Sequence, residues 1–295
     1  MHVVLAGASG FLGSHLRPFL EEHGHQVTPL VRRPARSRES SWDPYSGHVD
    51  HGLIADADVV INLAGSPTAG NPHSRKWAKE LEQSRVTTTG VLAQAIANAP
   101  IPPAFLAGNG ISYYGDHGSQ VLDESAASKG SALLTKVTRA WQAATQPASD
   151  AGARVAILRT APVMDERNAP LKLMLPVFRS GLGARIGSGQ QYFPMISLRD
   201  WVAAVGFLTE QPVSGPVNLC CESTPTNAEF TTALAELTRR RALMRTPASL
   251  VKVAAGPMAP EVLGSMNTKP VALLTAGYSF ADQGVREVLQ SGING

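Results

Sequence analysis

The sequence predicts an α/β protein of the Rossmann type, a doubly wound parallel sheet with a smaller C-terminal lobe. A glycine-rich turn follows the first apolar strand, and short apolar strands then alternate with amphipathic helices. Beyond residue 160, proline and glycine become frequent and the strands become short and widely spaced. We therefore expect a cofactor-binding domain over 1–160 and a substrate-binding lobe over 161–295, part of which returns to the sheet.

Hydrophobic periodicity places the individual elements. The expected strands of the first half cover 2–6, 26–31, 58–63, 104–107 and 154–158. The expected helices between them cover 11–23, 76–98 and 131–149. In the second half we expect helices over 198–210, 227–240 and 283–290, and one further sheet strand in "SGPVNL", residues 214–219.

The composition and charge of the chain argue against several classes of function. The chain has 295 residues, of which 43% are apolar and 17% charged, as is typical of a soluble globular protein. The net charge of +3 comes without a broad basic face or a reader motif, so nucleic-acid binding is not expected. No apolar run reaches membrane-spanning length and no leader precedes the first strand, so we expect a cytoplasmic protein that does not bind membranes. The adjacent Cys220 and Cys221 lack metal-ligand spacing, and we expect both to be buried, with no metal site.

The turn after the first strand carries a dinucleotide-binding pattern. In "VVLAGASGFLGSHL", Gly7 permits a tight turn, Gly10 lets the backbone approach a pyrophosphate, and Gly13 allows the helix to pack closely on the strand. The start of the following helix would face the phosphates. An ordinary glycine-rich turn is the structural alternative. The expected cofactor contacts in this segment are Gly7, Ser9, Gly10, Phe11, Leu12 and Gly13.

The end of the second strand favours NADP(H) over NAD(H). An NAD site carries Asp or Glu there for the ribose 2′-hydroxyl, whereas this chain has Arg32 and Arg33, and Glu39 is the nearest acid. A guanidinium pair suits a 2′-phosphate. A solvated basic turn is the alternative.

A third cofactor element is expected after the next strand. "DADVVINLAG" ends in small residues, which allow the backbone to lie beside the adenosine of the cofactor. The contacts expected there are Asn62, Leu63, Ala64 and Gly65.

These motifs resemble the extended short-chain dehydrogenase/reductase superfamily. The matching segments are the glycine turn, "NLAG" and "YYGD" at residues 113–116. More narrowly, the chain resembles an atypical NAD(P)-dependent epimerase-family subgroup of bacteria and animals, whose marks here are "SWDPYSGHVD", "QSRV", "GLGARIGSGQQYFPMISLRD", "SGPVNL" and "TNAEF". The resemblance covers nearly the whole chain. It implies a Rossmann fold and a nucleotide cofactor, and it implies little about the reaction.

The catalytic pair typical of that superfamily is missing. Its oxidoreductases use a Tyr and a Lys four residues later, assisted by Ser or Thr. The residues four positions after the five tyrosines are Val49, His117, Gly118, Ile196 and Asp282. On the expected helix the two positions align near Leu134 and Thr138, and Lys136 is rotated about 200° from that face, which predicts a lysine that faces solvent.

The loop "FLAGNGISYYGD" is where the chemistry is expected. The subgroup typically reads "SASAVGYYGD" there, so Ala107 and Asn109 replace its two serines. If the protein is catalytic, Asn109 would hold the substrate, and Tyr113 or Tyr114 would donate the proton. In the structural alternative, one tyrosine packs under the cofactor and the other lines the pocket.

Two functions stay open at this stage. The first is an NADP(H)-binding oxidoreductase or epimerase-like protein that acts on an unidentified small molecule. The second is a non-catalytic NADP(H)-binding sensor or regulatory protein, which the missing Tyr-Lys pair favours. Ordinary sugar-nucleotide dehydration or epimerisation ranks third, because those reactions need that tyrosine. A homodimer is left open.

Overall fold

A parallel sheet of seven strands forms the centre of the computed structural model, which describes residues 1–68 and 70–294. The strands lie in the order β11-β7-β5-β4-β1-β2-β3. Their bounds are β1 (His2–Ala6), β2 (Gln26–Val31), β3 (Ser40–Ser41), β4 (Val59–Asn62), β5 (Ala104–Gly110), β7 (Val155–Thr160) and β11 (Gly215–Leu219). The chain builds outward from β1 in one direction and then from β4 in the other, so the switch point of the sheet lies between β1 and β4.

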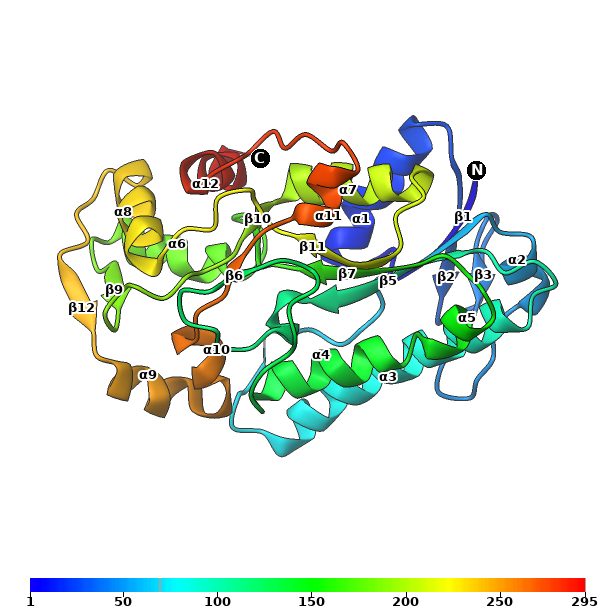
Figure 1. Cartoon of the computed structure of the whole chain (residues 1–295), viewed down its shortest axis with the longest axis horizontal. Helices are drawn as coiled ribbons and strands as arrows, with labels where there is room; N and C mark the ends of the chain where they lie inside the picture. The colour runs from blue at the N-terminus through cyan, green and yellow to red at the C-terminus, as the bar shows by residue number, and fades with distance from the viewer. Residues whose placement is uncertain (69, 295) are drawn as a thin grey trace.

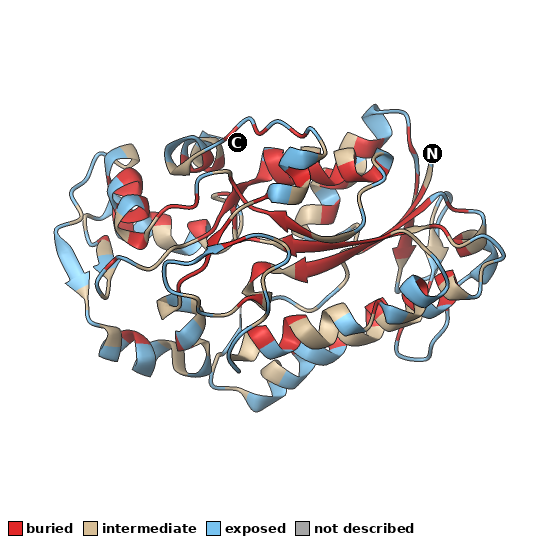
Figure 2. Cartoon of the chain, viewed as in Figure 1, coloured by how far each residue is buried: buried red, intermediate tan, exposed pale blue. Residues whose placement is uncertain are grey.

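Helices cover both faces of the sheet (Figure 1). One layer holds α1 (Phe11–Glu22), α7 (Leu198–Glu210), α11 (Val271–Thr275) and α12 (Val285–Asn294). The other holds α3 (Arg75–Ala97), α4 (Leu133–Ala143) and α5 (Gln146–Asp150). Figure 2 shows the strands buried between these layers. Because strand side chains alternate, Val3 and Leu5 join the apolar cluster under α1 and α7, and Val4 and Ala6 join the cluster on the other face.

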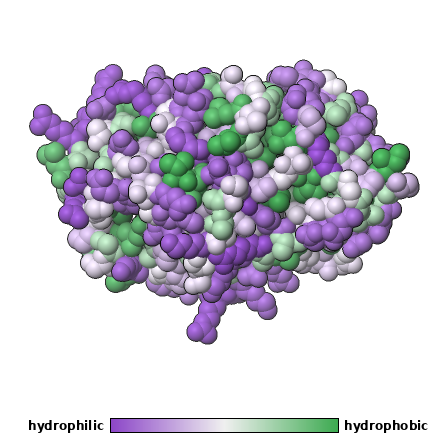
Figure 3. Space-filling view, in the orientation of Figure 1, coloured by the Kyte–Doolittle hydropathy of each residue, from purple (hydrophilic) through white to green (hydrophobic). Residues whose placement is uncertain are grey.

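A lobe lies beyond the carboxyl ends of the central strands, towards which the strand arrows point (Figure 1). Its elements are α6 (Leu171–Arg179), β9 (Ala184–Ile186), α8 (Asn227–Leu237), β12 (Met244–Thr246), α9 (Ala248–Ala255) and α10 (Ala259–Leu263). Phe178 and Phe230 belong to its own apolar cluster. On the face drawn in Figure 3, hydrophobic residues lie in small groups among hydrophilic ones.

Short elements connect the sheet to this lobe. They are η1 (Ile111–Tyr113), β6 (Val121–Leu122), β8 (Val163–Met164), β10 (Ile196–Ser197) and β13 (Asn267–Thr268), whereas α2 (His51–Ala55) follows β3 at the opposite end of the sheet (Figure 1). The pairs β6–β13 and β8–β10 are both parallel. Through β13, a segment near the C-terminus lies beside the loop that follows β5.

Most of the expected elements are present within two or three residues of their expected bounds. The strand expected in "SGPVNL" is confirmed, since β11 pairs with β7 at the edge of the sheet. The single helix expected over 131–149 is wrong: α4 ends at Ala143 and α5 begins at Gln146. Pro147 explains the break, because its ring would clash with the carbonyl four residues earlier and it has no N–H to donate. The division at residue 160 stays a prediction.

The two adjacent cysteines are buried, as the sequence led us to expect. Cys220 and Cys221 are both buried and unbonded to each other. Burial raises the pKa of the Cys221 thiol to about 12, so this side chain stays a neutral thiol.

Over the described part of the chain, no helix has the length and apolar character needed to cross a membrane.

Candidate active site

The glycine turn between β1 and α1 leaves no room for side chains at two of its positions. Gly7 has a φ of +84°, and a Cβ there would lie 2.6 Å from the backbone carbon of Leu63. A Cβ on Gly13 would lie 2.2 Å from the carbonyl oxygen of Gly7. The turn therefore packs directly on the segment that follows β4 and on its own helix. The positive φ of Gly7 agrees with the tight turn expected there, and the lack of space at Gly13 agrees with the close packing expected of the third glycine.

The start of α1 is open to an anion. Gly10 is its N-cap residue and supplies no side-chain cap, so the first N–H groups of the helix keep their hydrogen-bonding capacity. Ser9 and Gly10 are exposed, and Phe11 and Leu12 are half-buried. An uncapped helix start after a tight glycine turn, at the switch point of the sheet, fits the pyrophosphate of a dinucleotide. Contact of each of these residues with a cofactor stays a prediction.

The segment after β4 is shaped by Asn62. This side chain is fully buried, accepts a hydrogen bond from the Ala64 N–H at 3.0 Å, and donates one to the Thr89 hydroxyl at 2.9 Å. Its amide is therefore occupied within the protein. Leu63 and Ala64 are half-buried and Gly65 is exposed beside them, so the backbone here is what the site offers to a ligand.

A half-buried cation, Arg85, lies beside this segment, and no expectation from the sequence included it. Arg85 of α3 donates to Thr68 Oγ1 at 3.0 Å, and its guanidinium carbon lies 5.1 Å from the centre of a Trp141 ring. Burial lowers the pKa of Arg85 to about 10. The "QSRV" motif contains Arg85, and it was the signal that could have identified it. Its side chain supports the loop that holds Gly65.

The two arginines after β2 differ in their surroundings. Arg33 forms two hydrogen bonds of 2.7 Å with the Glu39 carboxylate. The Arg33 guanidinium, with the Arg36 N–H, lowers the pKa of Glu39 to about 2. Arg32 is exposed, and among the described residues it has no ion-pair partner. Glu39, the first acid after β2, is thus engaged, whereas Arg32 is unpaired; contact of Arg32 with a cofactor phosphate stays a prediction.

Asn109 at the end of β5 is engaged in the protein. Only 4% of the residue is exposed. Its amide nitrogen donates to the Thr138 carbonyl of α4 at 3.1 Å, and its oxygen accepts from the Gly110 N–H at 2.7 Å. In this arrangement the side chain holds β5 against α4 and turns the chain into η1.

Tyr114 is fully buried, and its hydroxyl has two partners. It donates to Asn218 Oδ1 at 2.8 Å and accepts from Arg159 Nη1 at 2.7 Å. Burial raises the pKa of Tyr114 to about 12, and the Arg159 cation opposes part of that rise. The geometry is that of a structural tyrosine that joins β7 and β11 to the loop. The structural alternative expected one of the two tyrosines to pack under the cofactor, and contact of Tyr114 with a cofactor stays a prediction.

Tyr113 has the freer hydroxyl. The residue is half-buried, and no hydrogen-bond partner for this hydroxyl lies within the described chain. The Arg159 guanidinium carbon lies 3.7 Å from the centre of its ring, and the ring meets that of Tyr114 edge-on at 5.7 Å. Of the two candidate proton donors, Tyr113 is therefore the one whose phenol is available.

The helix that would carry the Tyr-Lys pair contains a different arrangement. Lys136 is exposed, which confirms the expectation that it faces solvent. At the aligned position, the Leu134 N–H donates to the carboxylate of Glu261 at 3.0 Å. Burial raises the pKa of this carboxyl, and the nearby Ser112 side chain opposes part of that rise. Glu261 lies on α10, far along the chain, and no sequence signal connected it to the loop.

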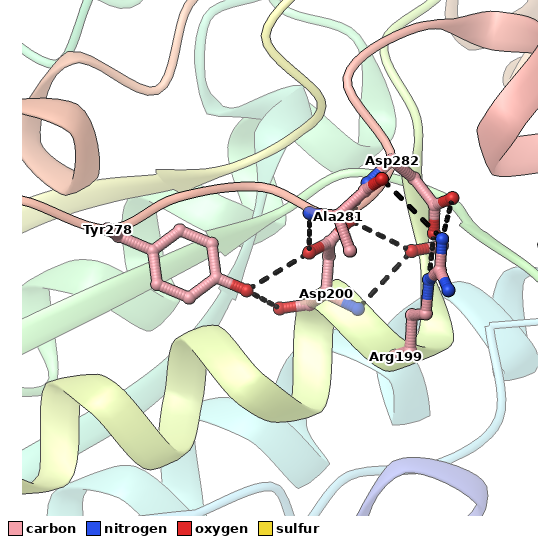
Figure 4. Close-up of polar contacts among 6 residues, drawn as sticks. Arg199, Asp200, Tyr278, Ala281 and Asp282 are labelled. Atoms are coloured by element: carbon pink, nitrogen blue, oxygen red, sulfur yellow. Dashed lines mark hydrogen bonds and ion pairs between the residues drawn. The ribbon is translucent and has the colours of Figure 1, made fainter.

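A separate cavity of about 1060 Å³ lies away from the glycine turn, against α1, α7 and the C-terminal segment. Beside it, the buried Asp200 carboxylate accepts hydrogen bonds from the Tyr278 hydroxyl and from the N–H groups of Ala281 and Asp282 (Figure 4). Arg199 donates in turn to Asp282 at 2.6 Å. This network ties the C-terminal segment to the start of α7, and its polar groups are used in doing so.

Comparison with known proteins points to one family. Residues 3–220 match the NAD dependent epimerase/dehydratase family. The chain is 40% identical to epimerase family protein Mb2239 of Mycobacterium bovis, over 97% of this chain and 96% of that protein. It is 33% identical to the human epimerase family protein SDR39U1, over 95% and 96% of the two chains. A crystal structure of human SDR39U1 (isoform 2) with NADPH superposes with a TM-score of 0.87 at 30% identity, covering 99% of each chain.

Proposed function

The chain belongs to the NAD dependent epimerase/dehydratase family, and we propose that it is an NADP(H)-dependent oxidoreductase or epimerase-like protein that acts on a small molecule. The observation that carries the cofactor half of this proposal is the packed glycine turn with its uncapped helix. The solved human relative was crystallised with NADPH, which supports the same cofactor here.

Preference for the 2′-phosphorylated cofactor rests on the end of β2. Ala6 pairs with Leu30 in the sheet, so the residues that follow both strands meet at one edge. Arg32 is free to meet a phosphate there, and Glu39 is held by Arg33. A carboxylate so engaged is a poor acceptor for a ribose hydroxyl.

When bound, the nicotinamide would supply hydride transfer. The chain's own residues would do the rest at the carboxyl end of β5, in the half of the sheet beyond the switch point. Tyr113 is the proposed proton donor, and the proposed role of Asn109 is to hold the loop in shape through its contact with α4. The partners proposed are a small-molecule substrate and, in an oligomer, a second copy of the chain.

A non-catalytic sensor is the second candidate, and a specific observation favours it. The helix that carries the Tyr-Lys pair in related oxidoreductases has Leu134 and Thr138 at the aligned positions, and the Thr138 hydroxyl bonds to the Leu134 carbonyl of its own helix. In that case the cofactor would bind without being turned over.

A screen of carbonyl compounds for NADPH oxidation separates the two candidates. The oxidoreductase proposal predicts turnover of at least one compound, and a rate about 100-fold lower in Tyr113→Phe. Tight NADPH binding without turnover of any compound would favour the sensor. An unchanged rate in Tyr113→Phe would remove that residue from the mechanism.

A further inference from the structure

The half-buried guanidinium of Arg85 carries a charge that no carboxylate neutralises. Among the residues that the structure describes, Arg85 takes part in no ion pair. By contrast, Arg33, Arg167 and Arg199 are each paired with a carboxylate, although their side chains are more exposed to water. A partly desolvated cation without a counter-charge costs free energy. The surroundings of Arg85 therefore favour an anionic partner from outside the chain.

Much of the hydrogen-bonding capacity of this guanidinium is also unused. Nη1 donates to the Leu81 carbonyl at 3.0 Å, and Nη2 donates to Thr68 Oγ1 at 3.0 Å. The Nε–H and the second N–H of each Nη have no partner in the described chain. Arg154 and Arg159 also lack an acid, but each donates to three acceptors of the protein. The planar fork of Arg85 can therefore still hold a carboxylate or a phosphate through two parallel hydrogen bonds.

The charge itself persists at neutral pH. Burial lowers the pKa of Arg85 to about 10, and no carboxylate raises it again. The face of the Trp141 ring, whose centre lies 5.1 Å from the guanidinium carbon, offsets part of the cost of burial. An oxyanion would be a stronger counter-charge than a ring face, because it carries a full negative charge.

The guanidinium lies beside the segment that we expect to meet the cofactor. A Cβ at Gly65 would lie 3.3 Å from Arg85 Cγ and 3.5 Å from its guanidinium carbon. Gly65 comes three residues after the end of β4, at the carboxyl edge of the sheet. Because Gly65 has no side chain, the cation lies directly against the backbone that faces a ligand.

Helix α4 places the same cation in the half of the site where the reaction would occur. Leu134, Thr138 and Trp141 share one face of α4, because they are spaced by one and two helical turns. This face lies against β5, since a Cβ at Gly108 would lie 3.1 Å from the Trp141 ring. It is the face that carries the Tyr-Lys pair in related oxidoreductases. Arg85 thus supplies a cation next to the helix face that lacks the usual lysine.

We propose that Arg85 binds a carboxylate or phosphate group of the substrate, and that the substrate is an acidic carbonyl compound such as an oxo acid. This inference rests on the proposed function and narrows it to a substrate class. The nicotinamide still supplies the hydride and Tyr113 the proton, so Arg85 binds and orients the substrate without exchanging a proton. The cofactor pyrophosphate has its own expected place at the start of α1, on the far side of the switch point.

The first test measures anion binding without turnover. Protein saturated with NADP⁺ is titrated with oxamate or inorganic phosphate and followed by tryptophan fluorescence, to which Trp141 contributes beside the guanidinium. We expect saturable binding of at least one anion and none of methyl oxamate, which is uncharged. Arg85→Gln should weaken anion binding by about 10-fold or more. Arg75→Gln, at an exposed arginine of the same helix, is the matched control and should change nothing.

A second variant guards against a loss of structure in Arg85→Gln. Arg85→Lys keeps the charge and loses the planar fork, so its anion affinity should lie between those of the wild-type protein and Arg85→Gln. Urea denaturation checks that both variants are folded. No response of the wild-type protein to either anion overturns the proposal, and so does equal weakening in Arg75→Gln and Arg85→Gln. Weaker NADPH binding in Arg85→Gln with unchanged anion binding also overturns it, because the guanidinium would then serve the cofactor.

The last test compares substrates and needs only the wild-type protein. In the carbonyl screen, each oxo acid is paired with its methyl ester, which differs from it by one charge. We expect kcat/KM to be about 10-fold or more higher for the acid of any pair that is turned over. Equal or faster turnover of the esters overturns the substrate class while the proposed function stands. Absence of turnover of every compound counts against the proposed function, and the anion titration still decides whether Arg85 is an anion site.

Discussion

Arg33 and Glu39 face each other at the edge of the candidate cofactor site, joined by two hydrogen bonds of 2.7 Å. An NAD site uses an acid at the end of the second strand. Here the first acid after β2 is Glu39, and its carboxylate is already bound by Arg33. The pairing also leaves Arg32 as the neighbouring free cation. We therefore expect cofactor choice to depend on which of these charges are already paired.

The titration of Glu39 tests this pair. The pKa of Glu39 is lowered to about 2 from 4.5, so the pair contributes stability above about pH 4.5 that is lost as the pH falls towards 2. We expect NMR of the Glu39 carboxyl to give a midpoint near that lower value. In Arg33→Ala the midpoint should return towards the ordinary glutamate range, and an identical midpoint in both proteins would contradict the pairing.

Gly13→Ala tests the glycine cradle. The new methyl would lie 2.2 Å from the Gly7 carbonyl oxygen, so the turn must open to admit it. We expect NADPH binding to weaken by about 10-fold or more, measured by fluorescence titration, because a strain of about 1–3 kcal/mol falls on the binding segment.

Gly90→Ala is the matched control for that substitution. Gly90 lies inside α3 with nothing within 4 Å of an added Cβ. Replacing it should stabilise the helix by up to about 1 kcal/mol and leave cofactor binding unchanged. Equal losses of NADPH affinity in the two variants would refute a special role for Gly13.

The two adjacent tyrosines should respond differently to loss of the hydroxyl. Tyr114→Phe removes the buried hydroxyl that donates to Asn218 Oδ1 and accepts from Arg159 Nη1, so the free energy of unfolding should fall by about 2 kcal/mol. Tyr113→Phe removes no hydrogen bond within the described chain and should change stability by less than about 0.5 kcal/mol. Urea denaturation of both variants measures this, and the reverse order would show that their roles are exchanged.

Asp200 should be essential for stability and dispensable for cofactor contact. Asp200→Ala leaves three donors of the C-terminal segment unsatisfied, at a cost of about 3 kcal/mol. Asp50→Ala, which removes an exposed cap from α2, should cost about 1 kcal/mol. Thermal unfolding compares them, and a smaller loss in Asp200→Ala than in Asp50→Ala would contradict the network in Figure 4.

Local features of the sequence predicted the local features of the structure. β1 and β2 have the expected bounds, because a short apolar run and its flanking turn residues are visible in a short window. The Gly7–Gly13 turn was equally predictable, since its requirements are steric and span seven residues. The break after Ala143 in the helix expected over 131–149 was missed, because the effect of Pro147 on the preceding turn was not considered, and α12 extends four residues beyond its expected end at residue 290.

Contacts between distant segments were not predictable in the same way. The pairing of Tyr114 with Arg159 and Asn218, and that of Leu134 with Glu261, join residues that no periodicity connects. Whether Asn62 and Asn109 face a ligand or the protein also depends on α3 and α4, against which each is packed. Residue type alone therefore identified the right loop and left the roles of its side chains undetermined.

Comparative titration of the protein with NADPH and NADH, followed by tryptophan fluorescence, tests the central claim most directly. We predict that NADPH binds about 10-fold more tightly or better, and that Arg32→Ala removes most of this difference by weakening NADPH alone. Arg38→Ala, at an exposed arginine beyond the turn, should change neither affinity. NADH binding as tight as NADPH binding in the wild-type protein would contradict the account.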